Sequence, residues 1–267
     1  MDLIKIAEEA FATGKQHPSF KAGDTITVNS NIKLYAVVLN RSAEEDLTLS
    51  VLLQSASSWK IGNGSSRGYN HIIFVGDSRT NRMQRTLQNL NSGYYESNLL
   101  RDIDFVYEEG KGLEWLKSQG MNSILSIAEE NYSVLKPTAV IFNLGVNDPG
   151  NMYDYISYYQ EIAESLQKKN CKLFFMSVNP VNSKTIVYLG KNAIRKEEVI
   201  RKFNSVVCSA LGSTFEYIDT YSYLMENGYG TNISGTGVDL PDDDGLHYTT
   251  KTYKRIFKYC LDYLILH

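Results

Sequence analysis

Three short stretches of the sequence carry side chains whose types can work together in catalysis. They are Gly76-Asp77-Ser78, Gly145-Val146-Asn147-Asp148 and Asp244-Gly245-Leu246-His247. A hydroxyl, an imidazole and a carboxylate can form a nucleophile, its general base and the group that orients the base, and an amide can donate a hydrogen bond to an oxyanion. If the three stretches meet in the fold, they can carry out acyl transfer through a serine nucleophile.

Ser78 follows a stretch that predicts a buried strand. The residues from Ile72 to Val75 are apolar without alternation, which is typical of a strand covered on both faces, and residues 80–90 can form a helix. A serine at this turn lies at the carboxyl end of the sheet, where open α/β folds keep their active sites, beside the free N–H groups of a helix N-terminus. Asp and Ser are also common helix caps, so the turn alone is equally compatible with a capping role.

From His71 onward, predicted strands and helices alternate along the chain, which favours a parallel sheet covered by helices. Strands are predicted at 72–75, 104–107, 138–144, 172–178 and 214–218, and helices at 80–90, 113–117, 123–135, 154–169, 195–211 and 249–266. We expect about five parallel strands, helices on both faces and a flavodoxin-like strand order. The carboxyl ends of parallel strands share one edge, so this fold brings the three polar stretches together.

Four blocks occur in a fixed order: Gly-Asp-Ser at 76–78, a glycine after the second strand, Gly-x-Asn-Asp at 145–148 and Asp-x-x-His at 244–247. This ordered set spans residues 71–267 and resembles the SGNH (GDSL-like) hydrolase family. The resemblance implies a flavodoxin-like three-layer α/β/α fold and a serine esterase that works through a covalent acyl-enzyme. It implies neither a metal ion nor a cofactor.

The resemblance also implies a role for each matching residue. Ser78 is then the nucleophile, His247 the general base, and Asp244 the carboxylate that holds the imidazole. The side-chain amide of Asn147 and the backbone N–H of Ser78 are then donors of the oxyanion hole.

The sequence leaves the roles of two oxyanion-hole positions open. Asn147 and Asp148 can instead be a turn pair that caps the next helix, and Asp148 is interpreted as structural. The remaining oxyanion donor is Gly110 or Gly112, since a backbone N–H that approaches the substrate closely favours a residue without a Cβ. Gly110 is preferred because it directly follows residues 107–109 at the end of the second strand.

Other conspicuous residues are interpreted as passive. Asp242 and Asp243 form a solvated acidic loop, because only Asp244 has the matching spacing to the histidine. Arg79 is expected on the surface of a helix, with substrate contact as the alternative. The tyrosine-rich stretch 153–159 is expected in and around the core, although tyrosines can also stack on a sugar ring.

The resemblance implies a small acyl ester as the substrate, with an acetyl group on a glycan as the leading candidate. The predicted site loops are short and contain no large apolar lid for a long acyl chain. An acyltransferase with the same triad and a non-catalytic cell-surface binding module are the alternatives. The spacing of Asp244 and His247 argues against the binding module, because a pure binder has no need of it.

Composition limits the partners. The chain has 267 residues, a formal net charge of −3 and 43% hydrophobic residues, which is typical of a globular protein and favours neither nucleic acid nor an anionic membrane as a partner. No stretch approaches the ~18 apolar residues of a membrane span. The histidines lack metal-ligand spacing, and Cys171, Cys208 and Cys260 are expected as separate, buried thiols.

Residues 1–68 are predicted to form a small β-rich segment and a linker, separate from a catalytic domain at 69–267. A hairpin pattern at 25–38 precedes a Gly/Ser-rich stretch, and residues 20–38 resemble the Listeria–Bacteroides repeat of surface proteins. Met1–Ala10 lacks the layout of a signal peptide, which predicts a cytoplasmic protein if this start is genuine. A piece of a longer secreted chain would instead lie outside the cell or on its surface.

Overall fold

The computed structural model describes residues 68–89, 102–188, 195–230 and 244–266. The hairpin pattern at 25–38 and the acidic pair at 242–243 therefore lie outside the described residues. The division into segments 1–68 and 69–267 stays a prediction.

Five parallel strands form one sheet. They are β1 (His71–Gly76), β2 (Ile103–Tyr107), β3 (Thr138–Asn143), β4 (Cys171–Met176) and β5 (Glu216–Ile218), in the order β2-β1-β3-β4-β5. This is the flavodoxin-like order, and it confirms the predicted fold class. The sheet brings the ends of β1 and β3 next to each other, because these two strands pair along their whole length.

The apolar runs of β1 and β3 are buried at every position, which explains their lack of alternation. Ile73 and Val75 face one half of the core, and Ile72 and Phe74 face the other. Each half needs its own layer of helices to exclude water.

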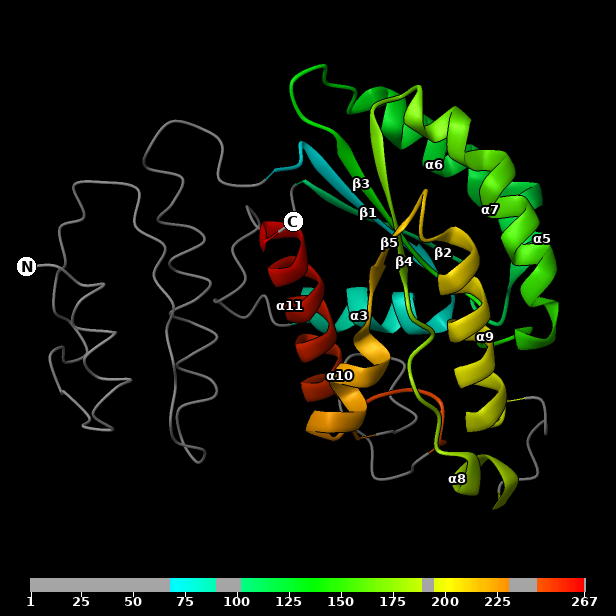
Figure 1. Ribbon diagram of the computed structural model, residues 1–267. Helices are drawn as coiled ribbons and strands as arrows, with labels where there is room; N and C mark the ends of the chain where they lie inside the picture. Colours follow the sequence, from blue (N-terminus) through cyan, green and yellow to red (C-terminus); the bar gives the residue numbers. More distant parts are fainter. Residues whose placement is uncertain (1–67, 90–101, 189–194, 231–243, 267) are drawn as a thin grey trace, which may run out of the picture. The chain divides into compact units, whose positions relative to one another are not determined.

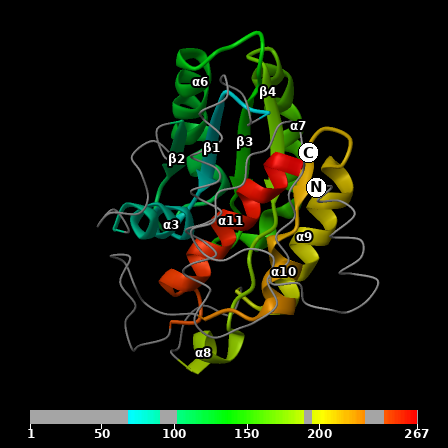
Figure 2. The ribbon, with the colours of Figure 1, turned by 90° about the vertical axis from the view of Figure 1, so that its left-hand side faces the viewer.

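On one face of the sheet lie α3 (Ser78–Asn89), α10 (Thr220–Asn227) and α11 (Thr250–Leu266) (Figures 1 and 2). Apolar residues one helical turn apart cover this face, such as Met83 and Leu87 on α3. Because α11 also packs on α3, the last helix of the chain lies beside the helix that begins at Ser78.

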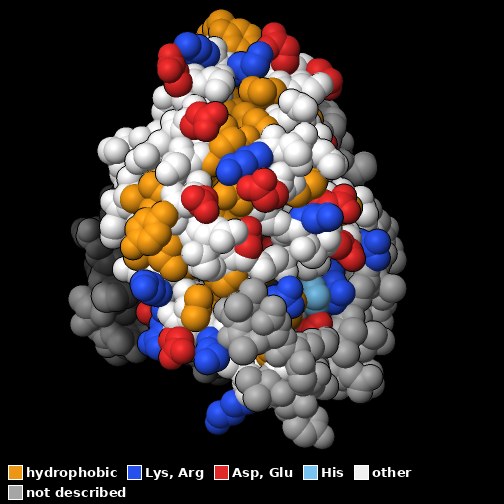
Figure 3. Space-filling model, turned by 90° about the vertical axis from the view of Figure 1, so that its right-hand side faces the viewer, with side chains coloured by type: hydrophobic (Ala, Val, Ile, Leu, Met, Phe, Trp, Pro, Cys, Tyr) orange, Lys and Arg blue, Asp and Glu red, His pale blue; other side chains and the backbone are white. Residues whose placement is uncertain are grey.

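On the opposite face lie α6 (Met121–Glu130), α7 (Met152–Gln167) and α9 (Glu197–Leu211), which completes a three-layer α/β/α arrangement (Figure 1). The outer surface of this layer carries basic and acidic side chains interspersed with hydrophobic ones (Figure 3). No helix in the parts of the chain that the structure describes is long and apolar enough to cross a membrane.

Some predicted helix bounds were wrong. The segments predicted at 113–117 and 123–135 form one nearly continuous helical stretch, α5 (Leu113–Trp115), the π-helical η2 (Leu116–Gly120) and α6, which ends at Glu130. Asn131 ends α6 with a φ of −106° and a ψ of 20°, and its side-chain amide donates to the Ile127 carbonyl, which also accepts its backbone N–H. The short helices α8 (Ser183–Tyr188) and α10 were not predicted, since their apolar patterns are too short to be recognised.

The three cysteines are free thiols. Cys171 and Cys260 are buried, as predicted, whereas Cys208 is only half-buried on α9. Burial raises the pKa of the Cys171 thiol to about 11, so this group stays protonated at neutral pH.

Candidate active site

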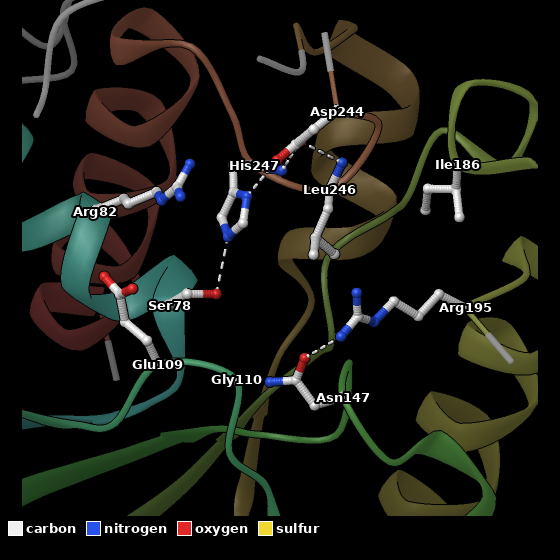
Figure 4. Close-up of a pocket in the computed structure, with 10 residues that line it drawn as sticks. All are labelled: Ser78, Arg82, Glu109, Gly110, Asn147, Ile186, Arg195, Asp244, Leu246 and His247. Carbon is white, nitrogen blue, oxygen red and sulfur yellow. Dashed lines mark hydrogen bonds and ion pairs between the residues drawn. The ribbon is translucent and has the colours of Figure 1, made fainter. Parts of the chain in front are cut away.

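The carboxyl edge of the sheet gathers the polar stretches around one pocket of about 270 Å³ (Figure 4). Ser78 is the first residue of α3, Asn147 follows β3, and Asp244 and His247 lie in the loop before α11. The lining residues of this pocket are Ser78, Arg82, Glu109, Gly110, Asn147, Ile186, Arg195, Asp244, Leu246 and His247. The structure thus places Ser78, Asn147, Asp244 and His247, all expected from the sequence, at a single site.

A chain of hydrogen bonds joins Ser78, His247 and Asp244 (Figure 4). His247 Nε2 lies 2.8 Å from Ser78 Oγ, and His247 Nδ1 lies 2.6 Å from Asp244 Oδ2. In a neutral imidazole that donates its Nδ1–H to the carboxylate, Nε2 is a hydrogen-bond acceptor directed at the serine hydroxyl. This arrangement allows the imidazole to take the hydroxyl proton.

Asp244 is held by a turn of its own loop. Its Oδ1 accepts hydrogen bonds from the backbone N–H groups of Leu246 at 2.9 Å and His247 at 2.8 Å. Burial raises the pKa of this carboxyl, but the hydrogen bonds and the charge of His247 outweigh burial, and the pKa falls to about 2. Asp244 therefore stays ionised over the whole range in which a histidine titrates.

The pKa of His247 is lower than the usual value. Burial of the ring is the main cause, the positive charges of Arg82 and Arg79 act in the same direction, and Asp244 opposes them. The ring is consequently neutral at neutral pH, which is the form that can act as a base.

Asp77, and not Ser78, caps α3 at this turn. Its Oδ1 accepts the backbone N–H of Arg79 at 2.9 Å, and its carbonyl accepts the N–H of Asn81 at 3.1 Å. Burial raises the pKa of the Asp77 carboxyl to about 6, against the charge and the hydrogen bond of Arg79. With the cap supplied by its neighbour, the hydroxyl of Ser78 is free to face His247.

The side chain of Asn147 does not cap a helix. Its Nδ2 donates to the carbonyl of Lys111 at 2.8 Å, and its Oδ1 accepts from Arg195 Nη2 at 2.7 Å. One N–H of the amide has no partner among the described residues. This N–H is available for a ligand in the pocket that Asn147 lines.

Asp148 makes structural contacts, in line with its interpretation from the sequence. Its Oδ2 accepts the backbone N–H of Leu113 at 2.9 Å, at the start of α5, and its Oδ1 accepts the hydroxyl of Tyr155 at 2.7 Å. Asp148 therefore ties the loop after β3 to α5 and α7.

Gly110 and Gly112 occupy different environments. Gly110 lines the pocket, has a φ of +71° and would meet no atom within 4 Å if it carried a Cβ. A Cβ on Gly112 would lie 2.2 Å from Asp148 Oδ2, and Gly112 is not among the pocket-lining residues. Gly110 therefore lies at the pocket, whereas the absence of a side chain at Gly112 leaves the space that Asp148 occupies.

Arg79 is not a surface residue, and that expectation was wrong. The side chain is 3% exposed and donates to the carbonyls of Leu246 at 3.0 Å, Asn179 at 2.8 Å and Pro180 at 3.2 Å. It also lies over the ring of Tyr248, 5.0 Å from its centroid. The three carbonyls come from two loops that meet only in the fold, so no local sequence pattern predicts that Arg79 is buried.

The tyrosine-rich stretch packs as expected. Tyr155 and Tyr159 are fully buried in the core below α7, whereas Tyr153 is exposed and does not line the pocket. Burial raises the pKa of both buried phenols, which keeps them in the neutral form.

Sequence reasoning missed Arg82, Glu109, Ile186, Arg195 and Leu246, which also line the pocket. Arg82 lies four residues after Ser78 on α3, so helical spacing could have identified it. Glu109, in the loop after β2, accepts a hydrogen bond from the side chain of Asn81 on α3. Arg195 carries no such signal, because it precedes α9 and reaches the pocket only through the packing of that helix.

The metal-binding residue types do not cluster in the described parts of the chain. No group of three His, Cys, Asp or Glu side chains there could hold a metal ion.

Comparison with known families gives one match that covers most of the chain. The sequence model of the GDSL-like Lipase/Acylhydrolase family matches residues 72–260. This range includes all the residues that surround the pocket.

Solved structures of similar shape include a GDSL-like lipase from Bacteroides thetaiotaomicron, 16% identical over 79% of this chain and 97% of that one, with a TM-score of 0.47. A psychrotrophic esterase from Pseudoalteromonas is 18% identical over 72% and 95%, with a TM-score of 0.44. The catalytic domain of peptidoglycan O-acetyltransferase A from Streptococcus pneumoniae is 13% identical over 73% and 94%, with a TM-score of 0.42.

Two curated relatives match this chain over a short stretch of 33 residues. It is 79% identical to the large ribosomal subunit protein bL19 of Parabacteroides distasonis and 61% identical to that of Porphyromonas gingivalis, and it covers 12% of this chain. The chain spans 29% and 27% of the length of these two relatives.

Proposed function

Because the chain belongs to the family of GDSL-like lipases and acylhydrolases, we propose that it is a serine esterase that removes small acyl groups, acetyl above all, from carbohydrate. Family membership makes the protein an SGNH-type hydrolase. The observation that carries the proposal is the hydrogen-bonded chain from Asp244 through His247 to Ser78 at the wall of a pocket.

In the first step, Ser78 Oγ attacks the acyl carbonyl carbon while His247 Nε2 takes the hydroxyl proton. The carboxylate of Asp244 holds the ring in the required tautomer and stabilises its positive charge. The carbonyl π electrons move to the oxygen, which becomes the oxyanion of a tetrahedral intermediate.

We assign the oxyanion to three donors: the backbone N–H of Ser78, the backbone N–H of Gly110 and the free side-chain N–H of Asn147. As the first residue of α3, Ser78 has an N–H without a partner inside the helix. Fixed donors of this kind stabilise charge that appears only in the transition state.

Collapse of the intermediate expels the alcohol, which receives the proton from His247, and leaves the acyl group on Ser78 as an ester. Water then attacks this ester with His247 again as base. The acid leaves, and the proton returns to Ser78 Oγ.

The size of the pocket supports a short acyl group. Its volume of about 270 Å³ lies below the roughly 300–1,000 Å³ typical of pockets that enclose drug-sized ligands. An acetyl group can fit beside Ser78 while a larger alcohol, such as a sugar, extends outward.

The test is a panel of nitrophenyl esters of increasing chain length and of acetylated glycans, with wild type and Ser78→Ala. We expect release of acetate by the wild type, a preference for the shortest esters and loss of on the order of 10³-fold in kcat in the variant. Equal rates for both proteins would contradict the serine mechanism. Transfer of acetyl to an added glycan would instead identify an acyltransferase, and glycan binding without turnover a binding module.

A further inference from the structure

We propose that Arg195 is a positioning residue that sets the orientation of the Asn147 amide and thereby completes the oxyanion hole. This inference rests on the proposed esterase function and adds a residue that the four motif blocks do not contain. Arg195 lies just before α9, far along the chain from Asn147, and the two side chains meet at the pocket (Figure 4).

An asparagine can serve as an oxyanion donor only if its NH₂ group, and not its oxygen, faces the substrate. Two contacts specify this orientation: Arg195 Nη2 donates to Oδ1 at 2.7 Å, and Nδ2 donates to the carbonyl of Lys111 at 2.8 Å. A flipped amide would place its NH₂ against the guanidinium and its oxygen against the carbonyl. Both contacts would then be repulsive, so the charged donor selects one orientation.

The guanidinium of Arg195 has few other partners. Asn147 Oδ1 is its one hydrogen-bond acceptor among the described residues, and its Nε is buried without a partner. Among the described residues no carboxylate forms a close ion pair with this partly buried cation, although the charges of Asp77 and Asp244 attract it from a longer distance. Burial removes the hydration of the guanidinium, so the cation contributes little to stability. Its placement is better explained by what it does to Asn147.

The contact also strengthens the donor. A hydrogen bond from a charged group to Oδ1 draws electron density from the amide and makes its N–H groups more polar. The effect reaches the oxyanion through Asn147, so it depends on that side chain.

The kinetic test compares Arg195→Met and Arg195→Lys with wild type on an activated acetate ester. We expect Arg195→Met to lower kcat about 10- to 100-fold, less than loss of the donor itself, with KM within about twofold. Arg195→Lys should restore part of kcat, because an ammonium can donate to Oδ1 but lacks the planar fork. Arg201→Met, an exposed arginine of α9, is the matched control and should be neutral.

A double-mutant cycle separates positioning from direct substrate contact. If Arg195 acts through Asn147, Arg195→Met should change kcat by less than about twofold in the Asn147→Ala background. The same large loss in both backgrounds, or a raised KM at unchanged kcat, would mean that Arg195 binds substrate, and would overturn the proposal.

A measurement without substrate keeps the two proposals distinguishable. The side-chain amide signals of Asn147, identified in an NMR spectrum by their loss in Asn147→Ala, should shift and lose their hydrogen-exchange protection in Arg195→Met. Unchanged signals would overturn the positioning role. Absence of turnover that depends on Ser78 would overturn the esterase, while these signals would still decide whether Arg195 orients the amide.

Discussion

At the scale of single residues, the site is built from groups whose protonation is set by their surroundings. Asp244 has a pKa of about 2 and is ionised, while burial and two arginines lower the pKa of His247. A neutral imidazole between an ionised carboxylate and a hydroxyl is ready to accept a proton. The protonation states, together with the distances, support the proposal that Ser78 is the group to be activated.

The first prediction concerns pH. The proposed mechanism needs neutral His247, so kcat/KM should fall on acidification through the pKa of His247, which lies below its usual value of about 6.5. Arg82→Gln removes a positive charge that opposes protonation, so the pKa of His247 should rise and the acid limb should move to higher pH. Profiles of kcat/KM against pH for both proteins measure this, with Arg85→Gln on the same helix as control. An acid limb that moves to lower pH in Arg82→Gln would contradict the electrostatic assignment.

The second prediction concerns Asn147. Asn147→Ala removes a proposed donor to the oxyanion. Loss of such a donor typically costs ~10²–10³ in kcat, while KM should change little. Its melting temperature should stay close to that of wild type, because the side chain bonds no helix N-terminus. Steady-state kinetics and thermal unfolding measure the two effects. A variant that melts lower and turns over normally would leave Ser78 and Gly110 as the only donors.

At the scale of the elements, loops from separate strands are tied together below the pocket. Asp148 joins the loop after β3 to α5 and α7, and Arg79 joins the start of α3 to the loops after β4 and before α11. These contacts involve buried or half-buried charged groups, whose hydrogen bonds are the stronger kind. They hold the catalytic loops without touching the pocket.

The third prediction compares the effect of replacing Asp148 with the effect of replacing its neighbour Asn147. Asp148→Ala removes the acceptor of the Leu113 N–H and leaves the buried Tyr155 hydroxyl unpaired, and an unpaired buried group costs about 1–3 kcal/mol. We expect a clearly lower free energy of unfolding by urea titration, with kcat reduced less than in Asn147→Ala. The opposite ranking of the two variants would mean that their roles are exchanged.

The fourth prediction concerns Arg79. Arg79→Met leaves three carbonyls without their donor, and such losses cost about 1–3 kcal/mol each where the acceptors are buried. Stability and kcat should fall together, because the Leu246 carbonyl next to His247 loses its anchor. Arg79→Lys should recover only part of both, since a lysine cannot reach three acceptors with a planar fork. Full activity in a stable Arg79→Met protein would contradict this role.

At the scale of the whole molecule, the hydrogen-bonded chain of Ser78, His247 and Asp244 joins the two ends of the described domain. Ser78 begins α3 after the first strand, and His247 precedes the last helix, 169 positions further along the chain. The contact depends on α11 packing against α3 over one face of the sheet. A site of this kind exists only while the domain is folded.

The fifth prediction follows from this dependence. In a urea titration, labelling of Ser78 by an activated phosphonate should be lost in the same transition as the far-UV circular dichroism signal, as for a cooperative unit. The Ser78→Ala variant provides the unlabelled control. Loss of labelling at a much lower urea concentration would show that the site opens locally while the sheet persists.

The sequence by itself determined the types and order of the strands and most helices, because unbroken apolar runs and helical spacing are local properties. It also identified Ser78, Asn147, Asp244 and His247 as candidates, since their side chains occur in short patterns, after predicted strands for Ser78 and Asn147 and before the last predicted helix for Asp244 and His247. Helix ends and the short helices were less predictable, because caps and packing decide them.

Only the tertiary structure decided how the loops fit together. It buried Arg79, distinguished Gly110 from Gly112, and brought Arg195 to Asn147. Each of these outcomes depends on contacts between elements far apart in the sequence, and such contacts leave no periodicity in either partner. The chemistry could thus be anticipated from residue types. The groups that orient the reacting side chains could be identified only in the folded structure, where the sheet brings its loops to one edge.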